Sequence, residues 1–440
     1  MCQHQSVSIR AISRNWAEQM GYYRFLNNDE VTASELSMSL ARHCQTQVEG
    51  RHILAISDSS EINLQAHAGR CKPENLGSVG NNDGLGFWLH PTLAVDAESG
   101  FPFGLSAVQI WHREVERLDK TQRRYKQLPI EAKESYKWIK SAVSSQPHFE
   151  SGGAVQVTYI GDREADIYEE WFDVPQLGAQ LLVRVGQDRT LVDKSNKLSV
   201  EVAQQSVQGS YPVVVPEDKR LKRPAREAFM SVRYGRVRIQ RPKRLSGEVY
   251  PASVTLCVVD AQEVSPPAGT EPLHWCLLTT HSVETLEQAL QVLKWYQWRW
   301  RIEQLFAILK QTGLDIEATQ LESAQAIQAL CVLALSASVR VLQLVEGRDD
   351  ATQPAAVVFP LDQQQCLVQL ACTLQGRTRK QQNPHPPQTL AWAAWCIARL
   401  GGWTGYSSQR PPGIVTMLRG LQQFDSFFAG WSFNRDVYTQ

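Results

Sequence analysis

Four side chains that could bind a metal ion and phosphate groups occur at helical spacing in one segment of the chain. The four are Tyr296, Arg299, Glu303 and Lys310, within residues 295–313. At about 100° per residue, they would lie within roughly 60° of one another on one face of a helix. A carboxylate flanked by Arg and Lys suits a metal ligand beside a polyanion, because the acid holds the cation and the bases hold phosphates. The alternative is a solvated helix face with ordinary charge pairs.

Two more acidic residues follow segments that are predicted to be strands. Residues 53–60 read ILAISDSS, with Asp58 after an apolar run, and residues 155–166 read VQVTYIGDREAD, with Asp162 after alternating apolar residues. A buried central strand delivers a carboxylate to a sheet edge in this way. The alternative for each aspartate is a helix N-cap. Together with Glu303, however, they would supply three hard oxygen ligands, which can hold a pair of Mg²⁺ ions beside water and phosphate.

Two segments are predicted to be long helices. Residues 295–313 would position Glu303, and Gly313 would end this helix. Its apolar stripe would consist of Ile302, Leu305, Ile308 and Leu309. Residues 326–345 form the most apolar long segment, but they include Gln328 and Arg340, so we expect a buried helix rather than a membrane span.

The net charge of the chain is unusual for a DNA-binding protein, but one segment is strongly basic. The formal net charge of the 440 residues is zero, whereas affinity for duplex DNA depends largely on phosphate neutralisation. Residues 219–244 nevertheless contain eleven basic residues and one acid: the basic residues are Lys219, Arg220, Lys222, Arg223, Arg226, Arg233, Arg236, Arg238, Arg241, Lys243 and Arg244. The alternation predicts a β-ribbon with Arg236 and Arg238 on one face and Val237 and Ile239 on the other. The alternative is a solvated hairpin protected by charges.

The cysteines indicate neither a zinc site nor a disulfide framework. Nine cysteines occur without a C-x-x-C pair, and the ten histidines show no ligand spacing. We interpret the cysteines as reduced thiols.

The chain resembles the insertion sequence four family of bacterial DDE transposases, in particular its Tn-five-like members. The Tyr-x2-Arg-x3-Glu-x6-Lys spacing that starts at Tyr296 matches the family's signature. The Gly-Asp-Arg-Glu-Ala-Asp string at 161–166 looks like its second-aspartate motif, and Asp58-Ser59-Ser60 resembles its first. The resemblance runs from about residue 22 to residue 403.

The resemblance implies an α/β fold with a ribonuclease H-like catalytic core, a β-strand insertion, and helical N- and C-terminal regions. Residues 1–50 would be the remnant of a helical N-terminal DNA-binding domain. Residues 51–345 would form the core, with the β insertion at about 190–272, where short β segments alternate with Gly and Pro. Residues 346–440 would form a linker, then a helical dimerisation region that includes an amphipathic helix over 389–400.

The function implied by the resemblance is cut-and-paste DNA transposition. Asp58, Asp162 and Glu303 would be the catalytic residues and would hold two Mg²⁺ ions, for which Mn²⁺ can substitute. The partners would be double-stranded DNA, as transposon terminal repeats and as target, and a second copy of the chain in a homodimer on DNA. A bacterial cytoplasmic, nucleoid-associated protein without membrane contact is expected.

Further residues would contact DNA by the same resemblance. Tyr296, Arg299 and Lys310 would hold terminal phosphates, and Arg184 matches a family arginine near the site. Trp275 matches a tryptophan that stacks a flipped base in members that use a hairpin intermediate; its alternative is core packing. The insertion would grip the transposon end through residues of the basic segment: Lys219, Arg220, Lys222, Arg223, Arg236 and Arg238.

The N-terminal region departs from the family pattern, because only 22 residues precede Tyr23-Arg24-Phe25. The first helices of the end-recognition domain are therefore expected to be missing. An alternative function follows, in which the chain is an N-terminally truncated, non-catalytic inhibitor that acts by dimerisation. A stand-alone structure-selective nuclease is a third possibility, which the basic insertion makes less attractive.

Overall fold

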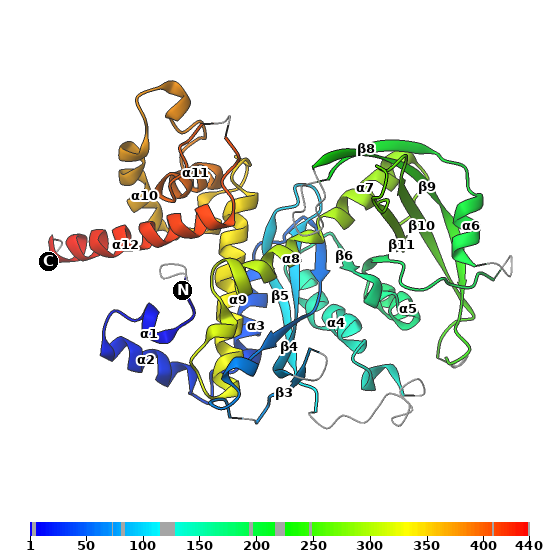
Figure 1. The fold of residues 1–440 in the computed structure, drawn as a ribbon, viewed down its shortest axis with the longest axis horizontal. Coiled ribbons are helices and arrows are strands. Elements are labelled where there is room, and N and C mark those ends of the chain that lie inside the picture. Colours follow the sequence, from blue (N-terminus) through cyan, green and yellow to red (C-terminus); the bar gives the residue numbers. More distant parts are fainter. Residues whose placement is uncertain are drawn as a thin grey trace. The chain divides into compact units, whose positions relative to one another are not determined.

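The computed structural model has a mixed α/β fold (Figure 1). It describes residues 1, 6–72, 74–80, 84–114, 128–192, 197–215, 225–245, 249–406 and 409–438. The chain divides into two compact units. Unit 1 comprises Met1–Gln47, Ser59–Arg117 and Trp300–Gln440, and unit 2 comprises Val48–Asp58 and Leu118–Arg299.

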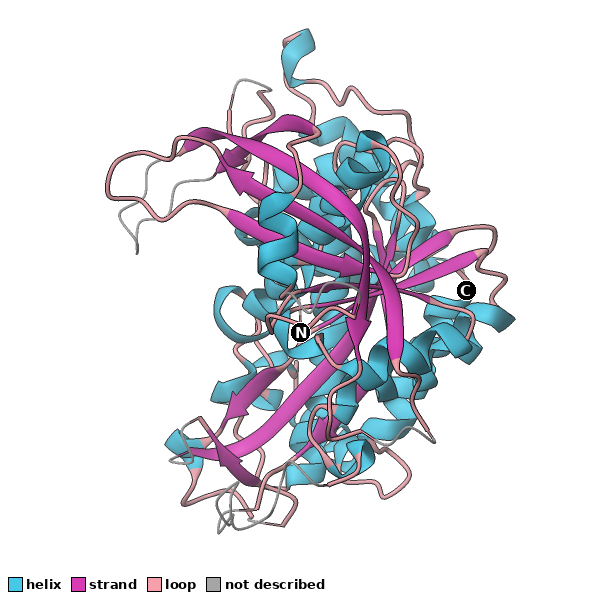
Figure 2. Cartoon of the chain, turned by 90° about the vertical axis from the view of Figure 1, so that its right-hand side faces the viewer, coloured by secondary structure: helices cyan, strands magenta, loops and turns pink. Residues whose placement is uncertain are grey.

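Unit 2 is built on a sheet that is parallel at one end and antiparallel at the other. In order across the sheet, its described strands are β1 (His52–Ser57), β6 (Gln156–Gly161), β7 (Gln180–Arg184), β11 (His274–Thr279), β10 (Ser253–Glu263), β9 (Arg226–Gln240) and β8 (Gly209–Val215). β1, β6 and β7 pair in parallel, and every pairing from β7 to β8 is antiparallel. Figure 2 shows the strong twist of the longer strands.

The parallel strands are buried along almost their whole length, as expected where both faces of a sheet are covered. The helices of unit 2 are α4 (Tyr136–Ser151), α5 (Tyr168–Gln176), α6 (Leu198–Gln204) and α7 (Leu286–Gln297). α4 packs on β6, α5 packs on β7, and both α6 and α7 pack on β9. α7 begins at a capping box, in which Thr285 accepts from the backbone of Gln288 and the Gln288 side chain accepts in return.

Strand β9 buries opposite faces in its two halves. Its pairing with β10 is regular from Met230 to Gln240. The buried residues are Ala228, Met230 and Val232 in the first half, and Val237 and Ile239 in the second. Arg236 and Arg238 are exposed, so the predicted alternation is confirmed. Strands also lie within the predicted insertion range, although β9 and β10 are longer than the short segments expected there.

Unit 1 contains antiparallel strands and most of the helices. β2 (Ser60–Asn63), β3 (Gly77–Val79) and β5 (Pro102–Trp111) all pair with β4 (Gly84–Asp96). α3 (Ala33–Gln45) and α9 (Ala324–Glu346) pack on β5. The other helices are α1 (Ile9–Ile12), α2 (Trp16–Leu26), α8 (Trp300–Ala307), α10 (Leu361–Leu374), α11 (Leu390–Leu400) and α12 (Ile414–Tyr438).

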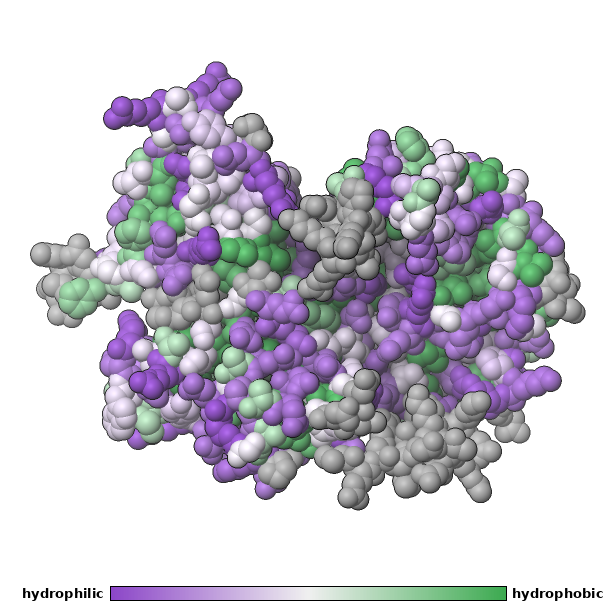
Figure 3. Space-filling view, viewed as in Figure 1, coloured by the Kyte–Doolittle hydropathy of each residue, from purple (hydrophilic) through white to green (hydrophobic). Residues whose placement is uncertain are grey.

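Helix α9 is the predicted buried helix. By length and composition alone it could cross a membrane, but 72% of its most apolar 18-residue stretch is buried inside the protein. Figure 3 shows hydrophilic and hydrophobic residues intermixed on the face in view.

The region after α9 is more ordered than the predicted linker. Helix α10 occupies 14 of its residues and buries Cys366, Leu367 and Ala371, so the linker interpretation is wrong there. The polar Gln residues concealed this apolar side of the helix. α11 and its N-cap, Thr389, match the helix predicted over 389–400. The division into domains at residues 50 and 345 stays a prediction.

Candidate catalytic site

Asp58 and Asp162 follow neighbouring parallel strands of unit 2. Ile56 pairs with Ile160 between β1 and β6, so the same register continued by two residues places Asp58 beside Asp162. Gly161 pairs with Val183 between β6 and β7, which places Arg184 in the next position of that row. The predicted delivery of both carboxylates to one sheet edge is confirmed.

Asp162 also has the local role that a strand-end aspartate commonly takes. Its Oδ1 accepts the Glu164 N–H at 2.8 Å and caps the 3-10 turn η5 (Arg163–Ala165). Gly161 is needed before it, because a Cβ there would lie 2.3 Å from the Cβ of Ala165. The turn therefore folds back tightly on the strand and fixes the position of the carboxylate.

The second aspartate of the same motif is structural. Asp166 is fully buried and forms an ion pair with Arg189, at 2.7 Å between Oδ1 and Nη2. Its other oxygen accepts the N–H groups of Gly186, at 3.0 Å, and Gln187, at 3.1 Å. Asp166 thus holds the loop after β7 in place, whereas Asp162 is only half-buried and the third acid of the motif, Glu164, pairs with Lys137 at 2.9 Å.

The predicted single helix over residues 295–313 is wrong. α7 ends at Gln297 and α8 begins at Trp300, and the N–H of Arg299 bonds to the carbonyl of Tyr296 three residues back. A π-helical turn, η6 (Ile308–Thr312), then ends the segment at Gly313, the predicted stop. Because a three-residue turn and a π-helical turn both change the angle per residue, the four signature side chains do not share one regular α-helical face.

Arg299 forms an ion pair with one of the two strand-end aspartates. Its Nη1 lies 2.9 Å from Oδ2 of Asp58, and the two side chains are only 15% and 21% exposed. The guanidinium centre also lies 5.9 Å from the centre of the Tyr296 ring. The structure therefore joins two residues that the sequence placed in separate motifs.

Tyr296 is buried among the charges of this edge. Burial raises the pKa of its phenol, Arg299 and Arg184 oppose that rise, and Asp162 adds to it. These electrostatic effects act at short range. Unit 2 therefore gathers Asp58, Asp162, Arg184, Tyr296 and Arg299.

Arg184 and Trp275 lie on the same face of the sheet. Arg184 pairs with Leu277 in the register of β7 and β11, and Trp275 is two residues before Leu277 on β11. Residues two apart on a strand share a face. Arg184 Nη2 also donates to the carbonyl of His274 at 2.8 Å, and Trp275 is half-buried.

The two remaining signature residues belong to unit 1. Glu303 lies in the first turn of α8 and is half-buried. Lys310 Nζ donates to the carbonyl of Glu61 at 2.8 Å and lies 3.0 Å from Oε1 of Glu317. The same Glu317 oxygen accepts the N–H of Asn63 at 3.0 Å. Lys310 thus joins η6 to β2, a structural role that the sequence did not indicate, because its partners are distant or lie beyond Gly313.

The donor types at this edge fit a divalent metal ion. Carboxylate oxygens are the ligands that Mg²⁺ prefers, and Asp58 and Asp162 directly follow the neighbouring parallel strands β1 and β6. Within the described ranges, no three His, Cys, Asp or Glu side chains are gathered so as to form a complete metal site.

The basic segment divides into internal and external cations. Four arginines have internal partners: Arg226 with Glu263, Arg233 with Asp260, Arg241 with the Tyr250 carbonyl, and Arg244 with Glu169. Arg236 and Arg238 remain on the exposed face, where Arg236 lies 4.0 Å from Glu284. The external charge is thus smaller than the sequence count indicated. Lys219, Arg220, Lys222 and Arg223 lie outside the described residues.

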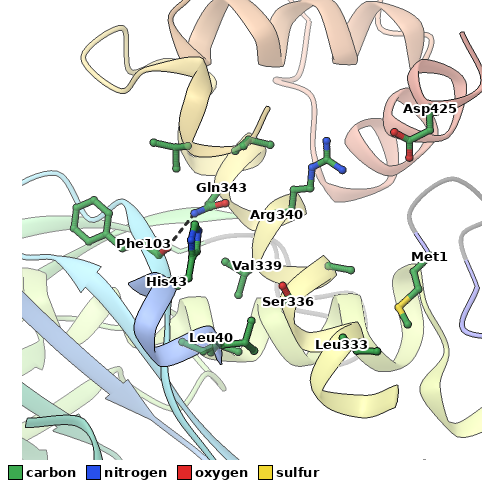
Figure 4. Close-up of a pocket in the computed structure, with 15 residues that line it drawn as sticks. Met1, Leu40, His43, Phe103, Leu333, Ser336, Val339, Arg340, Gln343 and Asp425 are labelled. Atoms are coloured by element: carbon green, nitrogen blue, oxygen red, sulfur yellow. Dashed lines mark hydrogen bonds between the residues drawn. The ribbon is translucent and has the colours of Figure 1, made fainter. Parts of the chain in front are cut away.

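Two cavities of about 450 Å³ lie inside the units. The cavity in unit 1 has a mixed polar and apolar lining, to which α3, β5 and α9 contribute. Gln343 Nε2 donates across its wall to the carbonyl of Phe103 at 3.3 Å (Figure 4). The cavity in unit 2 includes Arg184 and Arg163 with Asp260 and His274. Of the predicted site residues, Arg184 lines the cavity in unit 2.

A comparison with protein-family models gives one match in the middle of the chain. Residues 147–340 match the model described as a transposase DDE domain. The matched range includes most of the predicted site residues: Asp162, Arg184, Trp275, Tyr296, Arg299, Glu303 and Lys310. Asp58 lies outside the matched range and is joined to it by the β1–β6 pairing and by the ion pair with Arg299.

Proposed function

We propose that this chain is a cut-and-paste DNA transposase of the insertion sequence four type. The observation that carries the proposal is the row formed by Asp58, Asp162 and Arg184, with Arg299 paired to its first member. Acids and cations in one row suit phosphodiester chemistry, because the acids hold metal ions and the cations hold phosphate oxygens. The match of residues 147–340 to a transposase DDE domain supports this reading.

The metal-holding residues in this proposal are Asp58, Asp162 and Glu303. Two Mg²⁺ ions bound there, or Mn²⁺ in their place, would supply a nucleophilic water and neutralise charge on the leaving oxygen. The row register and the hard oxygen donors support the two aspartates. Glu303 is supported by its spacing from Tyr296 and Arg299 in the sequence.

The phosphate-holding residues are Arg184, Tyr296, Arg299 and Lys310. The two arginines can each present a planar fork of N–H donors to phosphate oxygens. The buried Tyr296 keeps its proton, because burial raises its pKa, and can donate from its hydroxyl. Lys310 would have to leave Glu317 before it could contact DNA.

The reaction would be a series of in-line displacements at phosphorus. Water adds to the scissile phosphorus, and the 3′ oxygen leaves and takes up a proton. In the hairpin route, that 3′-hydroxyl attacks the opposite strand, which closes a hairpin and displaces the 3′ oxygen of the flanking DNA; water then reopens the hairpin and regenerates the 3′-hydroxyl. Finally the 3′-hydroxyl attacks a phosphodiester of target DNA and displaces its 3′ oxygen. In the hairpin route, Trp275 would stack an unpaired base, for which its place on the Arg184 face is suitable.

The finer architecture belongs to the same proposal. We assign a ribonuclease H-like core on the basis of the parallel β1, β6 and β7 strands, which position the two aspartates. The basic face of β9 would contact end DNA through Arg236 and Arg238. Homodimer formation through the helices after residue 346 is expected from the family resemblance.

An excision assay in cells tests the proposal. A marker flanked by the native ends of the gene would be combined with the wild-type chain, Glu303→Ala, or Glu287→Ala. Glu287 is a suitable control because it is an exposed acid in the first turn of α7. We expect excision with the wild type and with Glu287→Ala, and none with Glu303→Ala.

Other outcomes would redirect the assignment. Excision by Glu303→Ala would remove Glu303 from the metal site. No excision by any of the three, combined with suppression of a co-expressed active transposase, would favour the inhibitor function.

A further inference from the structure

The ion pair between Arg299 and Asp58 gives the acidic edge a cation of its own. The 2.9 Å contact is made by side chains that are only 15% and 21% exposed, so water screens it less than an ordinary surface pair. The contact joins positions 241 residues apart. It is therefore a product of the fold rather than of neighbouring sequence.

The position of Arg299 in the fold allows its side chain to change partners. Its backbone lies in the two-residue turn between the end of α7 and the start of α8. Its guanidinium centre also lies 5.9 Å from the centre of the buried Tyr296 ring. A long side chain on a turn can exchange one partner for another without disrupting a helix.

A divalent ion and a guanidinium that bind one carboxylate compete for its negative charge. Mg²⁺ binds carboxylate oxygens at about 2.0–2.1 Å in strict octahedral geometry, and the two positive charges repel each other at that range. Asp58 and Asp162 follow neighbouring parallel strands, and two neighbouring carboxylates disfavour each other's charged forms, so a cation beside Asp58 reduces that repulsion.

We propose that Arg299 is the resident counter-ion of Asp58 and competes with the divalent metal ion for that carboxylate. This inference rests on the proposed function, because it takes Asp58 as a metal ligand. Metal affinity is then low while Arg299 is on Asp58. A DNA phosphate that draws the guanidinium away raises the affinity, so that DNA and metal bind cooperatively. By thermodynamic linkage, bound metal ion must then raise the affinity for DNA by the same factor.

Metal titration of the full chain without DNA tests the competition. Binding of Mn²⁺ would be measured by calorimetry for the wild type, Arg299→Gln, Asp58→Asn and Arg42→Gln. Arg42 is the control because it is an exposed arginine on α3 whose described contact is to the sulfur of Met38. We expect Arg299→Gln to bind Mn²⁺ about tenfold more tightly, within the usual range of coupling between sites. Arg42→Gln should match the wild type.

The Asp58→Asn arm separates this inference from the proposed function. If Asp58→Asn binds Mn²⁺ as the wild type does, Asp58 is not a metal ligand and the proposed site fails. If Asp58→Asn loses binding but Arg299→Gln gains none, the site stands and the competition is overturned.

A second measurement uses the unmodified chain, so the test does not depend on the folding of a variant. Saturating duplex DNA should lower the Mn²⁺ dissociation constant of the wild type several-fold. An unchanged constant would overturn the coupling. Circular dichroism checks that Arg299→Gln folds. In that variant, DNA should change the Mn²⁺ dissociation constant much less than in the wild type. An equal change in both proteins would show that Arg299 does not carry the effect.

Discussion

His52 and His281 share the hydroxyl group of Thr158. Each ring places Nε2 at 2.8 Å from Oγ1 of the fully buried threonine. A hydroxyl has one proton, so it can donate to only one ring and must accept from the other. Both rings also contact Trp295, at centroid distances of 4.9 and 5.0 Å. Burial, with a smaller contribution from His52, lowers the pKa of His281 to about 4.

The first prediction is a loss of stability in mild acid. The pKa of His281 is about 4 in the folded chain against 6.5 for the unperturbed group, so only the unfolded chain binds this proton between these values. The free energy of unfolding should therefore fall as the pH drops from 6.5 to 4, by up to about 3 kcal/mol. Thermal midpoints measured across this range would show the slope.

Two histidine variants check the assignment. His281→Gln should remove most of the pH dependence in this window. His112→Gln, at an exposed position, should leave it intact. An identical slope in wild type and His281→Gln would assign the effect to other groups.

The second prediction separates the two aspartates of the 161–166 motif. Asp166→Asn leaves the buried Arg189 without its charge partner, and breaking such a pair costs about 3–5 kcal/mol. Asp162→Asn keeps a capping side chain and should cost less than about 1 kcal/mol. DNA cleavage and thermal midpoint would be measured together. We expect Asp162→Asn to be stable and inactive, and Asp166→Asn to be markedly less stable. Equal stabilities would contradict the structural role of Asp166.

The third prediction concerns the turn that fixes Asp162. Gly161→Ala would place a methyl group 2.3 Å from the Cβ of Ala165 and 3.1 Å from the Trp138 ring. The turn must then move, which we expect to cost about 1–3 kcal/mol and to reduce cleavage strongly. Gly21→Ala is the control, since a Cβ in α2 meets nothing within 4 Å and should be neutral or stabilising by up to about 1 kcal/mol. Full activity of Gly161→Ala would disprove the tight fit.

The fourth prediction tests the exposed face of β9. Arg236→Glu with Arg238→Glu should weaken DNA binding and flatten the dependence of log K on log salt by about 2. A matched reversal of the exposed Arg42 and Lys140 should leave the slope unchanged. Filter binding at several salt concentrations gives both values. The same slope in both double variants would remove β9 from the DNA interface.

The strand-end aspartates could be predicted because their signal is local. Ile53 to Ile56 form an uninterrupted apolar run, and its end indicates where a carboxylate emerges. The alternation around Val237 is equally local and was also predicted. Both features depend on residues within a few positions of one another.

The break between α7 and α8 and the partners of the cations could not be predicted in this way. Periodicity extends through Trp298 and Arg299 without a Pro or Gly to mark the turn. The partner of Arg299 lies 241 residues away, and Lys310 meets Glu61 across 249 residues. Pairing at such separations is decided by packing of the whole chain, so a sequence count of charges overestimates how many face solvent.

The change of buried face along β9 has a consequence for how this strand tolerates mutation. In a complete substitution scan, polar replacements should be rejected at even positions from 228 to 232 and accepted at even positions from 236 to 240. Odd positions should show the opposite order, with rejection at 237 and 239. In a strand that buries the same face along its whole length, the positions that reject polar residues would be all even or all odd. In β9 the pattern reverses within the span from Arg233 to Arg236, so the solvent-facing surface of its second half can change in sequence without disturbing the core of its first half.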